Sequence, residues 1–143
     1  MTDRPLIYKK LALIETCVQE LESLARPEAI QSDVREERFI EHTLQVAIQA
    51  ATDVAAHIVA DERLGEPRTN RELFELLGRH AWVPGDLVAT LRAMVGFRNI
   101  LVHGYEAVDL GVVERIVRSD LGDLLRFTAA IREGLAAAGE AAE

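Results

Sequence analysis

Apolar and polar positions recur along the whole chain with the period of an α-helix. Apolar residues recur every three or four positions, the spacing that gathers them on one face of an α-helix. The pattern predicts five helices and no strand: about Pro5 to Arg26, an N-cap at Ser32 to about Gly65, a short helix from Thr69 or Asn70, about Asp86 to His103, and about Asp109 to Ala138. Short connections between long helices favour antiparallel neighbours. We therefore expect one all-α domain over residues 1–143, an up-and-down helical bundle.

The fourth predicted helix carries an unusual apolar stripe. Leu87, Leu91, Met94 and Leu101 fall within a narrow wedge at about 100° per residue. Arg98 lies in the middle of that wedge, where a core residue would be expected. A guanidinium is always charged and is rarely buried without a partner. Either the stripe faces something other than an ordinary core, or a carboxylate or phosphate meets Arg98 there.

A second polar row follows another face of the same helix. Around the helix axis, Arg92, Asn99 and His103 lie within about 40° of one another, whereas Arg98 and His103 are separated by about 140°. Within one chain, Arg98 and His103 do not share a face unless the helix unwinds between them. Pairing two copies of the helix across a two-fold axis would bring Arg98 near the other His103 and would also bury the stripe. This arrangement predicts a homodimer.

The residue types in this region suit cleavage of RNA. Partial negative charge at a helix C-terminus favours the protonated form of His103, and Tyr105 follows two residues later. Cleavage of RNA needs a base for the 2′-hydroxyl, an acid for the leaving 5′ oxygen and a cation for the phosphorane. Such chemistry requires no metal or cofactor. The competing interpretation is structural: Arg98 pairs with a core carboxylate in a monomeric bundle, and His103 caps a helix end.

Charge restricts where a polyanion could bind. The 143-residue chain has a net charge of -8, which argues against a broadly basic nucleic-acid-binding face. Residues 65–104 carry five basic and four acidic side chains, while the segments on either side are acidic. Any contact with a polyanion should therefore be local, in a cleft near the unusual helix.

The remaining candidate groups have simpler interpretations. Asp53 and His57 are four residues apart on the second predicted helix, and we expect a structural hydrogen-bonded pair. Glu37, Glu41 and His42 lack a second Glu-x-x-His unit, so no metal site is predicted.

The cysteine content and the lack of long apolar runs favour a reducing compartment and no membrane span. The single cysteine, Cys17, lies among apolar helix positions, which indicates a small core residue and fits a reducing environment. No run approaches the roughly 18 apolar residues of a membrane span, and the first residues lack the apolar core of a signal peptide. We expect a cytoplasmic protein without a membrane association.

The segment Gly96–Tyr105 resembles the signature of the HEPN ribonucleases, specifically the HepT-like toxin branch. That signature has an Arg followed by Asn, a His four to six residues beyond the Arg, and a Tyr two residues after the His. Further stretches also look like landmarks of this family: 44–50 with Asp53 and His57, 64–68, and 120–124. The resemblance covers nearly the whole chain.

The resemblance implies a function. It implies a homodimeric, metal-independent endoribonuclease in which Arg98 and His103 are catalytic and Asn99 is supporting. The helical spacing adds Arg92, on the same face as Asn99, as a second supporting residue. It also implies a toxin–antitoxin pair, the antitoxin being an MntA-like nucleotidyltransferase that transfers AMP to Tyr105. The alternative is a non-catalytic helical module that binds nucleotide or such a nucleotidyltransferase.

Overall fold

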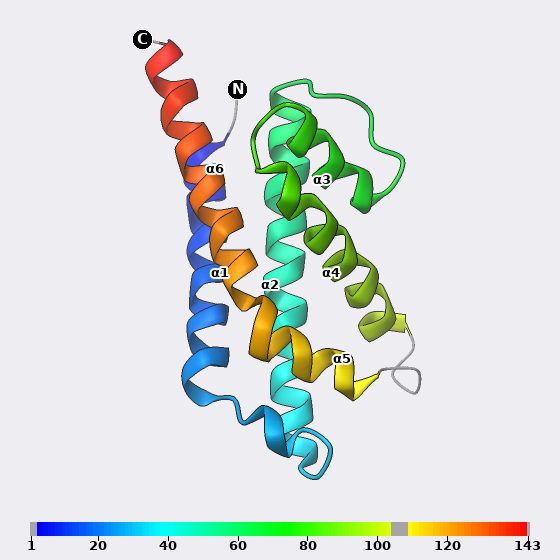
Figure 1. Ribbon diagram of the computed structural model, residues 1–143. Coiled ribbons are helices and arrows are strands. Elements are labelled where there is room, and N and C mark those ends of the chain that lie inside the picture. Colours follow the sequence, from blue (N-terminus) through cyan, green and yellow to red (C-terminus); the bar gives the residue numbers. More distant parts are fainter. Residues whose placement is uncertain (1–2, 104–108, 143) are drawn as a thin grey trace.

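The chain folds into a bundle of helices (Figure 1). A computed structural model describes the backbone of residues 3–103 and 109–142, and the side chains of residues 3–99 and 109–139. The elements are α1 (Arg4–Leu24), η1 (Pro27–Ala29), α2 (Val34–Asp61), α3 (Asn70–Arg79), α4 (Gly85–His103), α5 (Leu110–Arg115), a π-helical turn (Ile116–Asp120) and α6 (Leu121–Ala142). No strand occurs in the described ranges, and the predicted all-α fold is confirmed.

Short polar side chains begin most of these helices by accepting a backbone N–H, as expected for N-caps. They are Asp3 for α1, Asp33 for α2, Thr69 for α3 and Asp109 for α5. The predicted N-cap at Ser32 is wrong by one residue. The Ser32 hydroxyl donates to the Ala29 carbonyl in the turn after η1, so Asp33 takes the cap and accepts from the Arg35 N–H at 2.9 Å.

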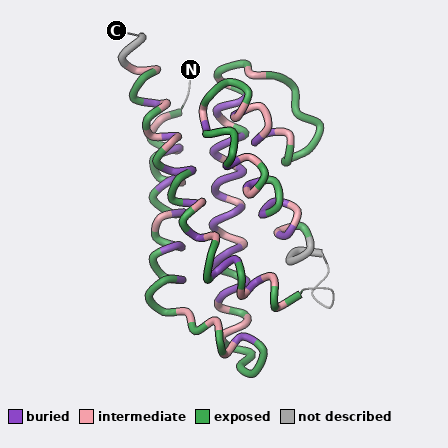
Figure 2. Tube along the Cα trace, in the orientation of Figure 1, coloured by how far each residue is buried: buried purple, intermediate pink, exposed green. Residues whose placement is uncertain are grey.

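Helix α2 lies at the centre of the bundle. It packs against α1 on one side and against α3 and α4 on the other, and α6 crosses over α1 (Figure 1). Buried residues follow the inward faces of the helices (Figure 2). Phe74 of α3 and Phe127 of α6 are both fully buried and meet edge to face, with 5.9 Å between ring centroids. Burying a side chain of this kind contributes about 1.5–3 kcal/mol, so contacts of this type hold the bundle together.

The fifth predicted helix is interrupted by a wider turn. The chain is helical from Leu110 to Ala142, but the turn over Ile116–Asp120 is π-helical and separates α5 from α6. A π-turn accommodates one extra residue within a helix. Ile116, Val117 and Leu121, in and directly after this turn, are all buried.

The apolar stripe of α4 lies inside its own subunit. Leu87, Leu91 and Met94 are 0%, 2% and 3% exposed and belong to the main core. The side chain of Leu101, the fourth residue of the predicted stripe, lies outside the described residues. The expectation that a second copy of the helix would bury this stripe is therefore wrong, because α2, α3 and α6 already cover it. What remains unusual about this face is Arg98 at its end.

Candidate functional site

Arg98 lies where α4 meets α1 and α2. Its side chain is half-buried, and Nε is buried without a hydrogen-bond partner among the described residues. The guanidinium borders a pocket of about 230 Å³ whose polar lining comes from α1 and α2: Lys10, His42, Gln45, Gln49 and Asp53. Arg98 forms no ion pair with any carboxylate of the described residues. A buried, unsatisfied donor of this kind is costly to a protein, which favours an anionic ligand.

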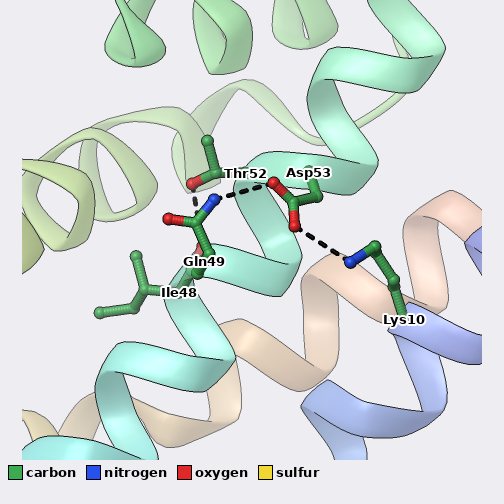
Figure 3. Close-up of polar contacts among 5 residues, drawn as sticks. All are labelled: Lys10, Ile48, Gln49, Thr52 and Asp53. Carbon is green, nitrogen blue, oxygen red and sulfur yellow. Dashed lines mark hydrogen bonds and ion pairs between the residues drawn. The ribbon is translucent and has the colours of Figure 1, made fainter.

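Asp53 is the carboxylate among the lining residues of this pocket, and both of its oxygens are engaged elsewhere (Figure 3). Oδ2 lies 3.0 Å from Lys10 Nζ of α1, and Oδ1 accepts from Gln49 Nε2 at 2.8 Å. The predicted pairing of Asp53 with His57 is therefore wrong. The side chain is held between α1 and the preceding turn of α2 instead. The contacts with Lys10 and Gln49 therefore engage the Asp53 carboxylate, which forms no ion pair with the Arg98 guanidinium in the same pocket.

Arg92 and Asn99 lie on a different side of α4. Both are exposed and line a pocket of about 460 Å³ between α3 and α4, so their predicted shared face is confirmed. Arg92 Nε contacts Glu75 Oε1 of α3 at 3.1 Å. This partner still leaves Arg92 half-exposed, and the guanidinium can reach other anions.

Helix α4 continues through His103, its last residue. The side chain of His103, and Tyr105 altogether, lie outside the described residues. The backbone register nevertheless separates the positions of Arg98 and His103 by about 140°. The helix does not unwind between them, so the two residues belong to different faces of α4 within one chain.

The remaining candidate features of the sequence are Cys17, possible metal ligands and possible membrane-spanning helices. Cys17 is buried in the core, and burial, followed by the nearby Glu20 carboxylate, raises the pKa of its thiol. Its prediction as a core residue is confirmed. Among the described residues, no group of three His, Cys, Asp or Glu side chains could hold a metal ion. None of the described helices is long and apolar enough to cross a bilayer.

Residues 14–131 match the family described as "Ribonuclease HepT-like". The chain belongs to this family. The sequence is 30% identical over 128 residues to the mRNA nuclease HepT of Shewanella oneidensis, covering 89% of this chain and 96% of the relative. It is also 33% identical over 78 residues to the tRNA nuclease HepT of Aphanizomenon flos-aquae, covering 54% and 53% of the two chains.

Several solved structures share the fold. A tri-AMPylated Shewanella oneidensis HEPN toxin in complex with an MNT antitoxin superposes with a TM-score of 0.84 at 30% identity, covering 93% of this chain and 99% of the other. A toxin–antitoxin complex with AMP-PNP has a TM-score of 0.85 at 28% identity, covering 91% and 99%. YutE of Bacillus subtilis matches with a TM-score of 0.85, 94% coverage of this chain and 91% of its own, but only 21% identity, and it shows the fold alone.

The polar surroundings of Arg98 include residues that sequence analysis did not single out. Lys10 reaches the pocket from α1, and its contact to Asp53 spans 43 positions, which no local pattern could reveal. The four-residue spacing of Gln49 and Asp53 was a usable signal, since such pairs face each other on a helix. On the other side of α4, Arg71 of α3 was missed for the same reason as Lys10, because only the tertiary structure brings it next to Gly96.

Proposed function

We propose that this HepT-like protein is the toxin of a toxin–antitoxin pair and a metal-independent endoribonuclease. The observation that carries the proposal is Arg98, with a buried Nε that lacks a partner and no ion pair among the described carboxylates. The two nucleases to which the chain is similar act on different RNA classes by name, mRNA and tRNA. RNA is therefore the substrate class that the proposal names.

The proposed site is composite and forms in a homodimer. Since Arg98 and His103 occupy different faces of one helix, Arg98 of one protomer and His103 of its partner supply the complete set. The 2′ oxygen bonds to phosphorus as its hydroxyl loses a proton, and the bond to the 5′ oxygen breaks as that oxygen gains one. His103 transfers protons and Arg98 stabilises the charge of the phosphorane, while Asn99 and Arg92 hold the strand.

The proposed partner is an MntA-like nucleotidyltransferase that acts as the antitoxin. Support comes from the solved relatives, one of which is an AMPylated HEPN toxin bound to an MNT antitoxin. Transfer of AMP to Tyr105 would place a bulky anion beside a phosphate-binding cleft and exclude RNA by repulsion and volume. The proposal places the protein in the cytoplasm, where its RNA substrate is found.

Mixing of inactive subunits tests the composite site. Arg98→Ala and His103→Ala are each expected to abolish cleavage of cellular RNA by the partner-free protein. Co-refolded or co-expressed dimers that contain one subunit of each variant rebuild one intact site and should recover activity. Arg79→Ala, an exposed arginine of α3, is the control and should remain fully active. Equal activity of His103→Ala and wild type would refute the catalytic role, and inactive mixed dimers would refute the composite site.

A binding module is the second candidate function, and the net charge of -8 favours it. A non-catalytic protein would bind nucleotide or pair stably with the nucleotidyltransferase. It would cleave no RNA and would not slow growth when expressed alone. Growth arrest on expression of the wild type, and not of His103→Ala, distinguishes the nuclease from this module.

A further inference from the structure

A third pocket, of about 520 Å³, lies on the side of α4 away from Arg98. Small and apolar side chains of α4 and α5 form much of its lining, and Arg71, Arg92 and Asp109 are its charged lining residues. An apolar surface bordered by guanidiniums is suited to a ligand that is flat and apolar at one end and anionic at the other.

Arg71 reaches this pocket because Gly96 has no side chain. A Cβ at Gly96 would lie 2.6 Å from Arg71 Nη2 and 3.3 Å from its Cζ, so the guanidinium rests directly on the backbone of α4. Arg71 is exposed and forms no ion pair with a carboxylate among the described residues. Its charge is therefore available to a ligand.

The acidic groups near the pocket are already engaged. Glu75 contacts Arg92 at 3.1 Å, and Asp109 Oδ1 accepts the Gly111 N–H at 2.9 Å as the cap of α5. The two arginines and these two carboxylates balance in formal charge, but Arg71 forms no ion pair with either carboxylate. Arg71 and the α4 residues of the pocket belong to residues 65–104, a stretch with a net positive charge, whereas Asp109 and Val112 lie outside it.

The register of α4 relates this pocket to His103. Gly96 and His103 are seven residues apart on a continuous helix, which places them within about 20° of each other and about 10 Å apart along the axis. The pocket therefore lies on the His103 side of α4, two turns away, and not on the side of Arg98.

We propose that this pocket is a nucleotide subsite for the RNA strand next to the cleaved bond. Arg71, assisted by Arg92, binds a backbone phosphate, and the base of that nucleotide lies on the apolar lining. The inference rests on the proposed ribonuclease function. An RNA nucleotide matches both halves of the pocket, since it couples a flat base to an anion. An acidic peptide would use the guanidiniums but not the apolar lining.

Equilibrium binding separates this subsite from catalysis. The dimer carrying His103→Ala is titrated with a fluorescent single-stranded RNA oligonucleotide, and affinity is measured over a range of salt concentrations. Adding Arg71→Met should weaken binding on the order of tenfold, because a charge-assisted contact is lost. The slope of log affinity against log salt should also fall by about 0.7, the value for one phosphate contact on a single strand.

Two further variants make the test specific. Gly96→Ala should have the same effect as Arg71→Met, since its Cβ displaces the guanidinium. Arg79→Met removes an exposed charge from the same helix outside the pocket and should leave affinity and slope unchanged.

The outcomes are distinguishable. Arg71→Met and Gly96→Ala variants that bind RNA like the Arg79→Met control would overturn the subsite while leaving the nuclease intact. The same result, combined with weaker binding of the nucleotidyltransferase, would assign the pocket to a protein contact instead. Failure of the proposed function itself would appear differently, as no RNA binding by the His103→Ala parent and no cleavage by the wild type.

Discussion

Lys10 of α1 and Asp53 of α2 form an ion pair (Figure 3), with 3.0 Å between Nζ and Oδ2, and both residues line the pocket that Arg98 also lines. Both side chains are roughly one-third exposed, so the pair adds at most about 1 kcal/mol to stability. Its larger effect is on charge: the Asp53 carboxylate is held by Lys10 and Gln49, and Arg98 stays unpaired.

Lys10→Met should therefore lower the cleavage rate more than it lowers stability. Without Lys10, Asp53 can turn toward Arg98 and neutralise the guanidinium that stabilises the transition state in the proposed site. We expect a loss on the order of tenfold in kcat, with a change of less than about 1 kcal/mol in the free energy of unfolding. Rates and denaturant unfolding of the same preparations provide both measurements.

The double variant Lys10→Met with Asp53→Asn is the control for this explanation. Removing the carboxylate's charge should restore most of the lost activity, because nothing then competes with the phosphate for Arg98. A double variant as slow as Lys10→Met alone would show that Lys10 acts in some other way.

Tyr105→Phe should separate modification from cleavage. The variant lacks the hydroxyl to which AMP would be transferred but keeps the aromatic ring, so we expect cleavage close to that of the wild type. Incubation with the nucleotidyltransferase and ATP should then neither add AMP nor reduce activity. Intact-mass spectrometry follows the modification, and AMP found on another residue of this variant would contradict the assignment of Tyr105.

Glu41 should make the fold less stable at neutral pH than an amide would. Its side chain is buried, and burial, followed by the neighbouring Glu37 carboxylate, raises the pKa of Glu41. The folded state therefore binds this proton more tightly than the unfolded chain, and stability is lost as pH rises through the raised pKa. Glu41→Gln should raise the thermal midpoint at pH 7, and its advantage should shrink as the pH falls below the ordinary range for glutamate. An unchanged thermal midpoint of Glu41→Gln at pH 7 would show that the buried Glu41 carboxylate does not destabilise the fold.

Two glycines of α6 should respond in opposite directions to alanine. A Cβ at Gly134 would lie 2.5 Å from the Trp82 ring, whereas nothing lies within 4 Å of one at Gly122. Gly134→Ala should cost about 1–3 kcal/mol through overpacking. Gly122→Ala should gain up to about 1 kcal/mol, because alanine favours a helix. Denaturant unfolding compares the two, and equal effects would show that Trp82 moves aside freely.

Helical periodicity was enough to predict the all-α bundle, because every long helix buries one regular stripe. It failed where a helix departs from 3.6 residues per turn, as at Ile116–Asp120, where no proline or glycine marks the change. Periodicity also did not indicate which surface the apolar stripe of α4 packs against. Leu87, Leu91 and Met94 were correctly grouped, but spacing alone could not show that their neighbours belong to the same subunit.

The candidate site was predicted to a similar extent. The spacing along α4 indicated that Arg98 is exceptional and that Arg92 shares a face with Asn99. The pockets beside these residues are also lined by Lys10 and Arg71, which come from other helices. Their positions depend on how α1 and α3 pack against α4, and no local spacing in the sequence predicts that packing.

The π-helical turn between α5 and α6 makes this part of the chain tolerant of a change in length. A π-turn holds one residue more than a regular turn, so deleting a single residue from Ile116–Asp120 would leave an ordinary α-helix. Helix α6 would keep its orientation toward α1, and Gly134 would still lie under Trp82. The same deletion inside α2 would rotate every later residue of that helix by about 100° and turn its buried face toward solvent.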